Sequence, residues 1–259
     1  MRNTLAKTIR HHSVLTLLAF SLSIFAVTCK RGETGTPLER ITKLIEENPK
    51  VVQNYYVRAH IYELEGIKKL AREDYTRIIQ IDSTAKNAYH ARGMIYFFEK
   101  YYPEALRDFS RAIAIDSTWG NPYTMRAWCY EKLRNFDAAV IDLNRCIRLD
   151  SGDSLSLPRR AEDLRILGRY EEAISDYKRL ADQQERGKFI GDLRLTCVNL
   201  CEMLSAIGKN QEALDYINKA IAPLETDSAK FREYDSYLLY YRGLLNYRLG
   251  KYEQAMTDL

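Results

Sequence analysis

Alanine recurs at a fixed interval of 34 residues, at Ala71, Ala105, Ala139 and Ala173. Sliding the chain against itself by the same interval also aligns the aromatic residues Tyr55, Tyr89 and Tyr123. Matches at several positions of successive units are the signature of a repeat architecture, in which each unit is one supersecondary element and neighbouring units bury a shared core. The chain is therefore predicted to fold as an array of repeats.

Each unit reads as two helices. With a unit numbered from 1 to 34, aligned aromatic or small residues fall at positions 4, 8 and 11, and again at 20 and 24, which marks one face of a first helix and one face of a second. Small residues at positions 8 and 20 let two antiparallel helices approach closely. Between the helices stand Leu64-Glu65-Gly66, Leu133-Arg134-Asn135 and Leu167-Gly168-Arg169, where Gly or Asn can end a helix in the left-handed conformation. An all-α fold follows.

The best-formed units resemble the tetratricopeptide repeat (TPR) family, through Tyr89-x-x-x-Gly93-x-x-Tyr96 followed by Ala105-x-x-x-Phe109-x-x-Ala112. The resemblance covers residues 37–259 and implies a right-handed superhelical solenoid of antiparallel helix pairs. About six units are expected, preceded by a capping helix within residues 37–49. Their predicted bounds are 52–85, 86–119, 120–153, 154–193, 194–235 and 236–259, the last of them incomplete.

The spacing stretches toward the end of the chain, since Ala213 follows Ala173 by 40 residues and Ala255 follows Ala213 by 42. The added residues fall around 182–191 and 223–234, where we expect longer helices or longer connections. The sequence stops at Leu259, about two turns into a second helix. We expect either that the protein continues beyond this point or that a partner completes the last pair.

Arginine repeats at unit position 7 and aspartate at position 23. An antiparallel pair brings these positions to similar height, so the sequence predicts bidentate ion pairs between the two helices. The fifth unit lacks both partners and has Leu200 and Tyr216 instead, as expected if the two residues depend on each other. The alternative is that the arginines form a track for a polyanion.

Residues 1–28 are predicted to be an export signal, because basic residues precede an acid-free apolar run from Val14 to Val27. This run is shorter than the roughly 20 residues that span a bilayer. Residues 26–29 resemble the processing box of bacterial lipoproteins, which implies a lipid anchor on Cys29 and a tether over residues 29–36. An outer-membrane lipoprotein of a Gram-negative bacterium is expected; ordinary cleavage and an uncut anchor remain alternatives.

Charge argues against nucleic acid as a partner. The chain has 39 Lys and Arg against 35 Asp and Glu, and residues 1–28 hold three of the former and none of the latter, which leaves 36 against 35. A nearly neutral mature chain lacks the one-sided basic surface that nucleic-acid binding requires.

No nucleophile elbow, phosphate-binding glycine loop or zinc-protease motif is present, so we expect no enzyme, no cofactor and no small-molecule substrate. His60 and His90 could hold a metal together with Glu63, but two histidines and one carboxylate make a weak site, and no metal is expected. Cys129 and Cys146 lie at heights too different for a disulfide, and Cys197 and Cys201 are interpreted as buried free thiols.

The resemblance places a partner-binding groove along the first helices, at unit positions 2, 5, 9, 12 and 13. The groove residues singled out are Tyr56, His60, His90, Met94, Phe97, Phe98, Trp128 and Lys132. A strip this apolar suits a peptide or helix of a partner protein, unless the three largest apolar side chains merely pack between units. The expected function is a non-enzymatic scaffold of the cell envelope. The alternative is the ligand-sensing or glycan-uptake accessory portion of a larger signalling or transport system.

Overall fold

The computed structural model describes residues 35–149, 156–185, 193–225 and 235–258. Across these residues the regular secondary structure is entirely helical, and none of the helices is both long and apolar enough to span a bilayer. The helices form two compact units, one ending at Thr118 and the other beginning at Trp119, which we call the N-terminal body and the C-terminal body. The predicted signal peptide and Cys29 lie outside the described residues.

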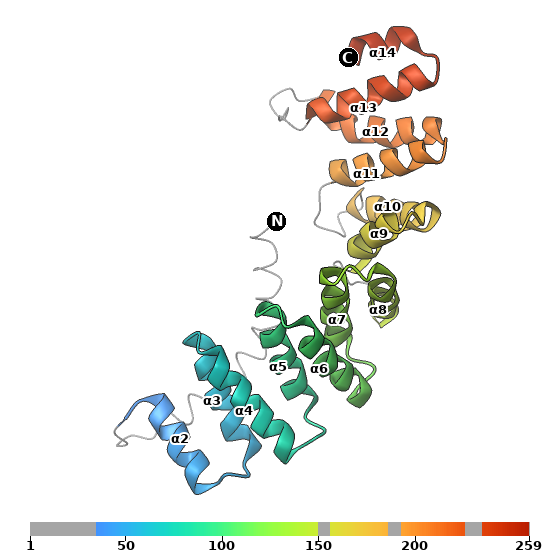
Figure 1. The fold of residues 1–259 in the computed structure, drawn as a ribbon. Coiled ribbons are helices and arrows are strands. Elements are labelled where there is room, and N and C mark those ends of the chain that lie inside the picture. Colours follow the sequence, from blue (N-terminus) through green and yellow to red (C-terminus); the bar gives the residue numbers. More distant parts are fainter. Residues whose placement is uncertain (1–34, 150–155, 186–192, 226–234, 259) are drawn as a thin grey trace. The chain divides into compact units, whose positions relative to one another are not determined.

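The N-terminal body is a single helix followed by two helix pairs (Figure 1). Its helices are α2 (Pro37–Glu47), α3 (Val52–Leu64), α4 (Lys68–Ile81), α5 (Lys86–Phe98) and α6 (Tyr102–Ile115). Thr36 begins α2 as a capping box: its hydroxyl accepts from the Glu39 amide at 3.2 Å, and the Glu39 carboxylate accepts from the Thr36 amide at 2.7 Å. The predicted capping helix is therefore present.

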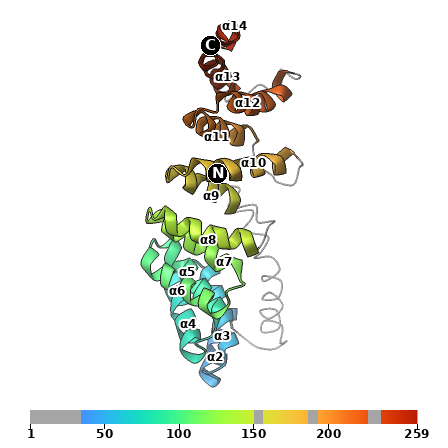
Figure 2. The ribbon, with the colours of Figure 1, turned by 90° about the vertical axis from the view of Figure 1, so that its right-hand side faces the viewer.

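The C-terminal body contains four further pairs. They are α7 (Gly120–Lys132) with α8 (Phe136–Leu149), α9 (Ser156–Ile166) with α10 (Tyr170–Glu185), α11 (Leu193–Ala206) with α12 (Asn210–Glu225), and α13 (Asp235–Arg248) with α14 (Tyr252–Asp258). Within each body, every helix packs against the helix that follows it in the chain (Figures 1 and 2). Six pairs and a leading helix agree with the array predicted from the sequence. The second helices α10 and α12 have 16 residues, against 14 for α4, α6 and α8, as the stretched spacing predicted.

The turns inside the pairs share one geometry. Each has a residue with positive φ at unit position 15, which is glycine in four pairs, Lys100 in the second (φ 67°) and Arg134 in the third (φ 59°). The following amide then bonds back to a carbonyl five residues earlier, as from Ile67 to Tyr62 at 2.8 Å. The expectation that Asn135 is the left-handed residue was wrong. Its side chain instead accepts from the Ala138 amide at 3.2 Å and so begins α8.

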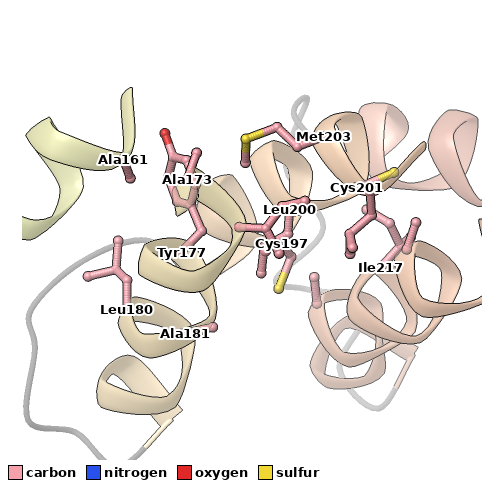
Figure 3. Packing of buried hydrophobic residues seen from close by; sticks show 14 of the residues in the cluster. Ala161, Ala173, Tyr177, Leu180, Ala181, Cys197, Leu200, Cys201, Met203 and Ile217 are labelled. Carbon is pink, nitrogen blue, oxygen red and sulfur yellow. The ribbon is translucent and has the colours of Figure 1, made fainter. Parts of the chain in front are cut away.

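Small residues allow the close helix contact that the repeat requires. A Cβ placed on Gly93 would lie 2.8 Å from a ring carbon of Phe109, so the second pair closes only with glycine at unit position 8. Alanines at positions 8 and 20 are fully buried in the neighbouring pairs. In the C-terminal body the core continues from one pair to the next, with Cys197 and Leu200 of α11 beside the residues of α10 (Figure 3).

Candidate protein-interaction surfaces

Five buried ion pairs hold the first and second helices of a pair together. Arg58 donates to both carboxylate oxygens of Asp74, at 2.9 and 2.7 Å, and the same two-pronged contact recurs in four other pairs. These are Arg92–Asp108, Arg126–Asp142, Arg160–Asp176 and Arg242–Asp258. The aspartate side chains are only 3 to 7% exposed. The predicted pairs are confirmed, and the arginines are occupied within the fold rather than forming a polyanion track.

Arg92 and Arg160 also reach the preceding pair, which the sequence did not reveal. Arg92 donates to the Thr76 hydroxyl at 3.0 Å, and Arg160 donates to the Asn144 side-chain oxygen at 2.5 Å. Both acceptors occupy unit position 25. A polar residue at this position, two residues after the repeated aspartate, was the available signal. The arginine thus fixes the orientation of one pair relative to the next as well as closing its own pair.

In the N-terminal body, the predicted groove residues of α3 are only partly accessible. Tyr56 is half-buried, its ring meets Tyr75 edge-on at 6.1 Å, and burial raises the pKa of its hydroxyl to about 12. His60 is half-buried as well, and its Nδ1 lies 3.5 Å from a Glu63 carboxylate oxygen. Both side chains retain some surface for a ligand.

His90 on α5 lies deeper. Its ring packs 5.7 Å from that of Phe109, and burial lowers its pKa to about 4, so the imidazole is neutral near pH 7. Across the described part of the chain, no group of three His, Cys, Asp or Glu side chains is arranged to hold a metal ion. A ligand would therefore meet His90 as an uncharged group.

The end of α5 is more open. Met94 and Phe97 are half-buried, whereas Phe98 is 52% exposed. Phe97 contacts the rings of Phe98 and Tyr102 at 5.6 and 5.8 Å. This aromatic cluster is accessible at the turn into α6, so part of the predicted apolar strip reaches the surface.

Trp128 is buried, although the sequence placed it among the residues of the partner-binding groove. It is 8% exposed, and the Arg159 guanidinium lies over its ring at 4.5 Å while also bonding Glu131 in a two-pronged contact. Trp128 therefore packs between α7 and α9, which is the alternative raised for the large apolar residues. Lys132, at the end of the same helix, is exposed.

The most exposed aromatic surface on a first helix was missed. On α13, Tyr237, Tyr240 and Tyr247 are 63, 52 and 61% exposed, and they occupy unit positions 2, 5 and 12 when numbering is anchored on Ala255. Leu195, at position 2 of α11, is 54% exposed. The two helices are in contact, and the Tyr241 hydroxyl donates to the Glu202 carboxylate at 2.5 Å. We call this surface the tyrosine face (Leu195, Tyr237, Tyr240, Tyr247). The groove positions used for the first three units would have identified it if they had been applied to the fifth and sixth units.

Four cysteines in the described helices are buried and form no disulfide: Cys129, Cys146, Cys197 and Cys201. Burial raises the pKa of Cys129 and of Cys201 to about 12, so these thiols are unreactive near neutral pH. The interpretation of Cys197 and Cys201 as buried thiols is confirmed, as is the prediction that Cys129 and Cys146 are not joined in a disulfide.

With this geometry established, comparison with known proteins identifies the type of repeat. The sequence profile described as Tetratricopeptide repeat matches residues 87–118 and 121–153, the second and third pairs. These two pairs are tetratricopeptide repeats, and the described helix pairs have the all-α fold of TPR proteins. A comparison with functionally curated proteins found no match.

Solved TPR structures share the fold. YrrB, described as a TPR protein with an unusual peptide-binding site, is 24% identical with a TM-score of 0.61, over 71% of this chain and 92% of its own. The C-terminal part of a TPR repeat-containing protein from Cytophaga hutchinsonii is 16% identical with a TM-score of 0.65, over 86% and 87%. A TPR protein from Parabacteroides merdae is 18% identical with a TM-score of 0.53, over 86% and 82%. Proteins of this fold are generally non-catalytic interaction scaffolds.

Proposed function

We propose that this chain is a non-enzymatic scaffold of the bacterial envelope that binds a peptide or helix of a partner protein on the exposed faces of its first helices. The observation that carries the proposal is the tyrosine face. Three large rings stand more than half exposed on α13, whereas α7 has Asn121, Thr124 and Glu131 at the equivalent positions and its large apolar residue at position 9, Trp128, is covered. Tyrosines combine a large contact area with a polar tip and few rotatable bonds, which suits them to protein recognition.

The described chemistry supports binding rather than catalysis. The buried thiols are protonated, the buried aspartates of the repeat are held by arginine, and no metal cluster occurs in the described helices. YrrB, the TPR structure described as having a peptide-binding site, lends support for a peptide as the ligand. Envelope location rests on the predicted signal and on Cys29, which would anchor the chain through an attached lipid.

Site-specific photocrosslinking in cells tests the binding proposal. A photoreactive residue at position 237 or 240 should capture one and the same protein, whereas the same residue at position 141 should not. Ile141 is a matched control because it is 66% exposed but lies on a second helix, α8, away from the tyrosine face. The Tyr237→Ala/Tyr240→Ala variant should then bind the identified partner at least tenfold more weakly. Equal capture at all three positions would refute the tyrosine face, and specific binding of an oligosaccharide there would favour the glycan-uptake alternative.

The anchor is tested separately. Mass spectrometry of the membrane fraction should find an acylated Cys29 as the first residue of the mature chain. If Cys29→Ala is recovered in the same fraction, with the signal still attached in the wild type, the chain is not a lipoprotein.

A further inference from the structure

One edge of the N-terminal body carries a second exposed apolar surface, separate from the tyrosine face. Leu64 and Ile67 flank the α3–α4 turn and are 71 and 38% exposed. Phe98 and Tyr101 flank the α5–α6 turn and are 52 and 53% exposed. The second two residues follow the first two by 34 positions, so both turns present the same two unit positions, 13 and 16. We call these four residues the turn edge.

The two turns belong to one continuous surface because α4 packs against α5. Arg72 of α4 bonds the Glu99 carboxylate at 2.5 Å, and its guanidinium lies 5.2 Å from the centre of the Tyr96 ring. Tyr96 in turn meets Tyr101 edge-on at 6.4 Å. Contacts with residues of α4 and α5 thus hold Tyr101 in place at the turn edge.

An internal comparison shows that an apolar edge is not required by the fold. In the C-terminal body, positions 13 and 16 include at least one charged or amide side chain in every pair: Lys132, Asn135, Arg169, Lys209, Arg248 and Lys251. A solvated edge therefore carries polar residues, and the four apolar residues of the N-terminal body need a separate explanation.

The charged residues around the turn edge favour contact with an anionic surface. Lys68, Lys69 and Lys100 stand exposed among the apolar residues of the turn edge, whereas Glu99 is neutralised by Arg72 and the exposed acids beside Leu64 are Glu63 and Glu65. Exposed aromatic and aliphatic side chains can insert at the interface of a bilayer, and the neighbouring lysines can bind its anionic headgroups. A lysine near such a surface strengthens binding by about fivefold.

The path of the chain brings the same edge toward a membrane. Contacts of Tyr55 with the Pro49 carbonyl and of Asn54 with the Leu44 carbonyl join the end of α2 to the start of α3, so the two helices are antiparallel. The start of α2 therefore lies at the end of the body where the α3–α4 turn lies. Thr36 stands seven positions after Cys29, so the tether reaches at most about 25 Å. A lipid on Cys29 would hold the start of α2, and with it this end of the body, within that distance of the bilayer.

We propose that the turn edge of the N-terminal body docks on the surface of an anionic lipid bilayer. The contact is additional to the lipid on Cys29 and leaves the tyrosine face to bind protein. The lipid restrains only one end of the chain, so a second contact of this kind fixes the side of the body that faces the bilayer.

The test uses the full chain on nanodiscs, with Cys29→Ser so that an environment-sensitive dye labels one introduced cysteine. The four buried cysteines are shielded from the label. One variant carries Tyr101→Cys at the turn edge, and its control carries Ser83→Cys, an exposed residue in the α4–α5 connection at the opposite edge. On discs with about one third phosphatidylglycerol, the label at 101 should shift to shorter emission wavelength and be quenched by brominated lipid at least twofold more than the label at 83.

Two further arms make the outcome decisive. Discs without anionic lipid should reduce the quenching at 101, and so should Lys68→Glu/Lys69→Glu/Lys100→Glu on anionic discs. Equal quenching at 101 and 83 overturns the proposal, and so does quenching at 101 that persists both without anionic lipid and with the three lysines replaced. Because no protein partner is present, these results do not depend on whether the tyrosine face binds a peptide.

Discussion

The third and fifth helix pairs close in different ways. In α7–α8, Arg126 donates to both oxygens of Asp142 at 2.8 and 2.7 Å, and the carboxylate is almost fully buried. In α11–α12, the same two positions hold Leu200, which has no exposed surface, and Tyr216, which is half-buried under Lys219. One backbone arrangement thus accepts either a buried ion pair or an apolar contact, provided that both residues change together.

The difference indicates what the ion pair contributes. Removing two charges from water costs about as much free energy as their attraction and hydrogen bonds return, so an apolar pair of similar volume is often equally stable. The repeated arginine and aspartate are therefore better explained by the fixed orientation that their directional bonds impose on the helices. The following predictions test this interpretation.

The largest effect is expected from breaking one ion pair on one side. Asp142→Ala should lower the free energy of unfolding by about 3 kcal/mol or more, because Arg126 is left largely buried without its carboxylate. The double variant Arg126→Leu/Asp142→Tyr, which copies the fifth pair, should lie within about 1 kcal/mol of wild type. Urea denaturation followed by circular dichroism measures both. A double variant as unstable as the single one would show that the two pairs are not interchangeable.

A second difference between the pairs lies at unit position 9, where the third pair has buried Trp128 and the fifth has exposed Glu202. Trp128→Ala should cost about 3 kcal/mol, because it removes a buried ring that packs under Arg159. Lys132→Ala on the same helix serves as the control and should stay within about 0.5 kcal/mol of wild type. An unchanged melting temperature for Trp128→Ala would restore this residue to the list of partner-binding candidates.

Position 10 is apolar and buried in the third and fifth pairs, as Cys129 and Met203, but it is Asp163 in the fourth. Burial, and then the charge of Glu131, raise the pKa of Asp163 to about 7 despite the nearby Arg159. The folded state therefore binds a proton that the unfolded state, with a pKa near 4, has released. Stability should fall as the pH rises from about 4 to 7, and the loss should be complete above 7.

The Asp163→Asn variant tests whether Asp163 causes this pH dependence of stability. The amide stays neutral, so the variant should be more stable than wild type by about 2 kcal/mol at pH 8 and should lose this advantage near pH 4. Chemical denaturation at several pH values gives the comparison. A difference that is the same at pH 4.5 and pH 8 would assign the pH dependence to other groups.

The smallest effect on folding is expected at the tyrosine face. Tyr240 is more than half exposed, so Tyr240→Ala should change the free energy of unfolding by less than about 0.5 kcal/mol while weakening partner binding. Thermal unfolding separates the two consequences. A loss above about 1 kcal/mol would mean that Tyr240 belongs to the core, like Trp128.

The repeat, the helix pairs and the ion pairs could be read from the sequence because each depends on spacing that recurs within the chain. The solvent exposure of individual side chains could not be predicted from this recurring spacing. Trp128 occupies a groove position, but Arg159 from the next first helix covers it, and that contact depends on the packing of α9 against its neighbours. The tyrosine face escaped notice for another reason: the stretched units lie six to eight residues out of register with the others, and the groove positions were not carried across them.

The replacement at Leu200 also changes how one pair is joined to the next. Where an arginine is present it can bond backward, as Arg160 does to Asn144, and such bonds fix an angle. Leucine cannot do so, and α11 meets α10 through apolar contacts such as those of Cys197 and Leu200 with the core in Figure 3. Contacts of this kind resist separation far more than they resist sliding, because the hydrophobic effect has no preferred direction. Across the same junction, the ion pair between Lys178 of α10 and Glu212 of α12 supplies a directional contact in place of the arginine. We therefore expect the fourth and fifth pairs to owe their relative orientation to this ion pair rather than to the contacts of α11.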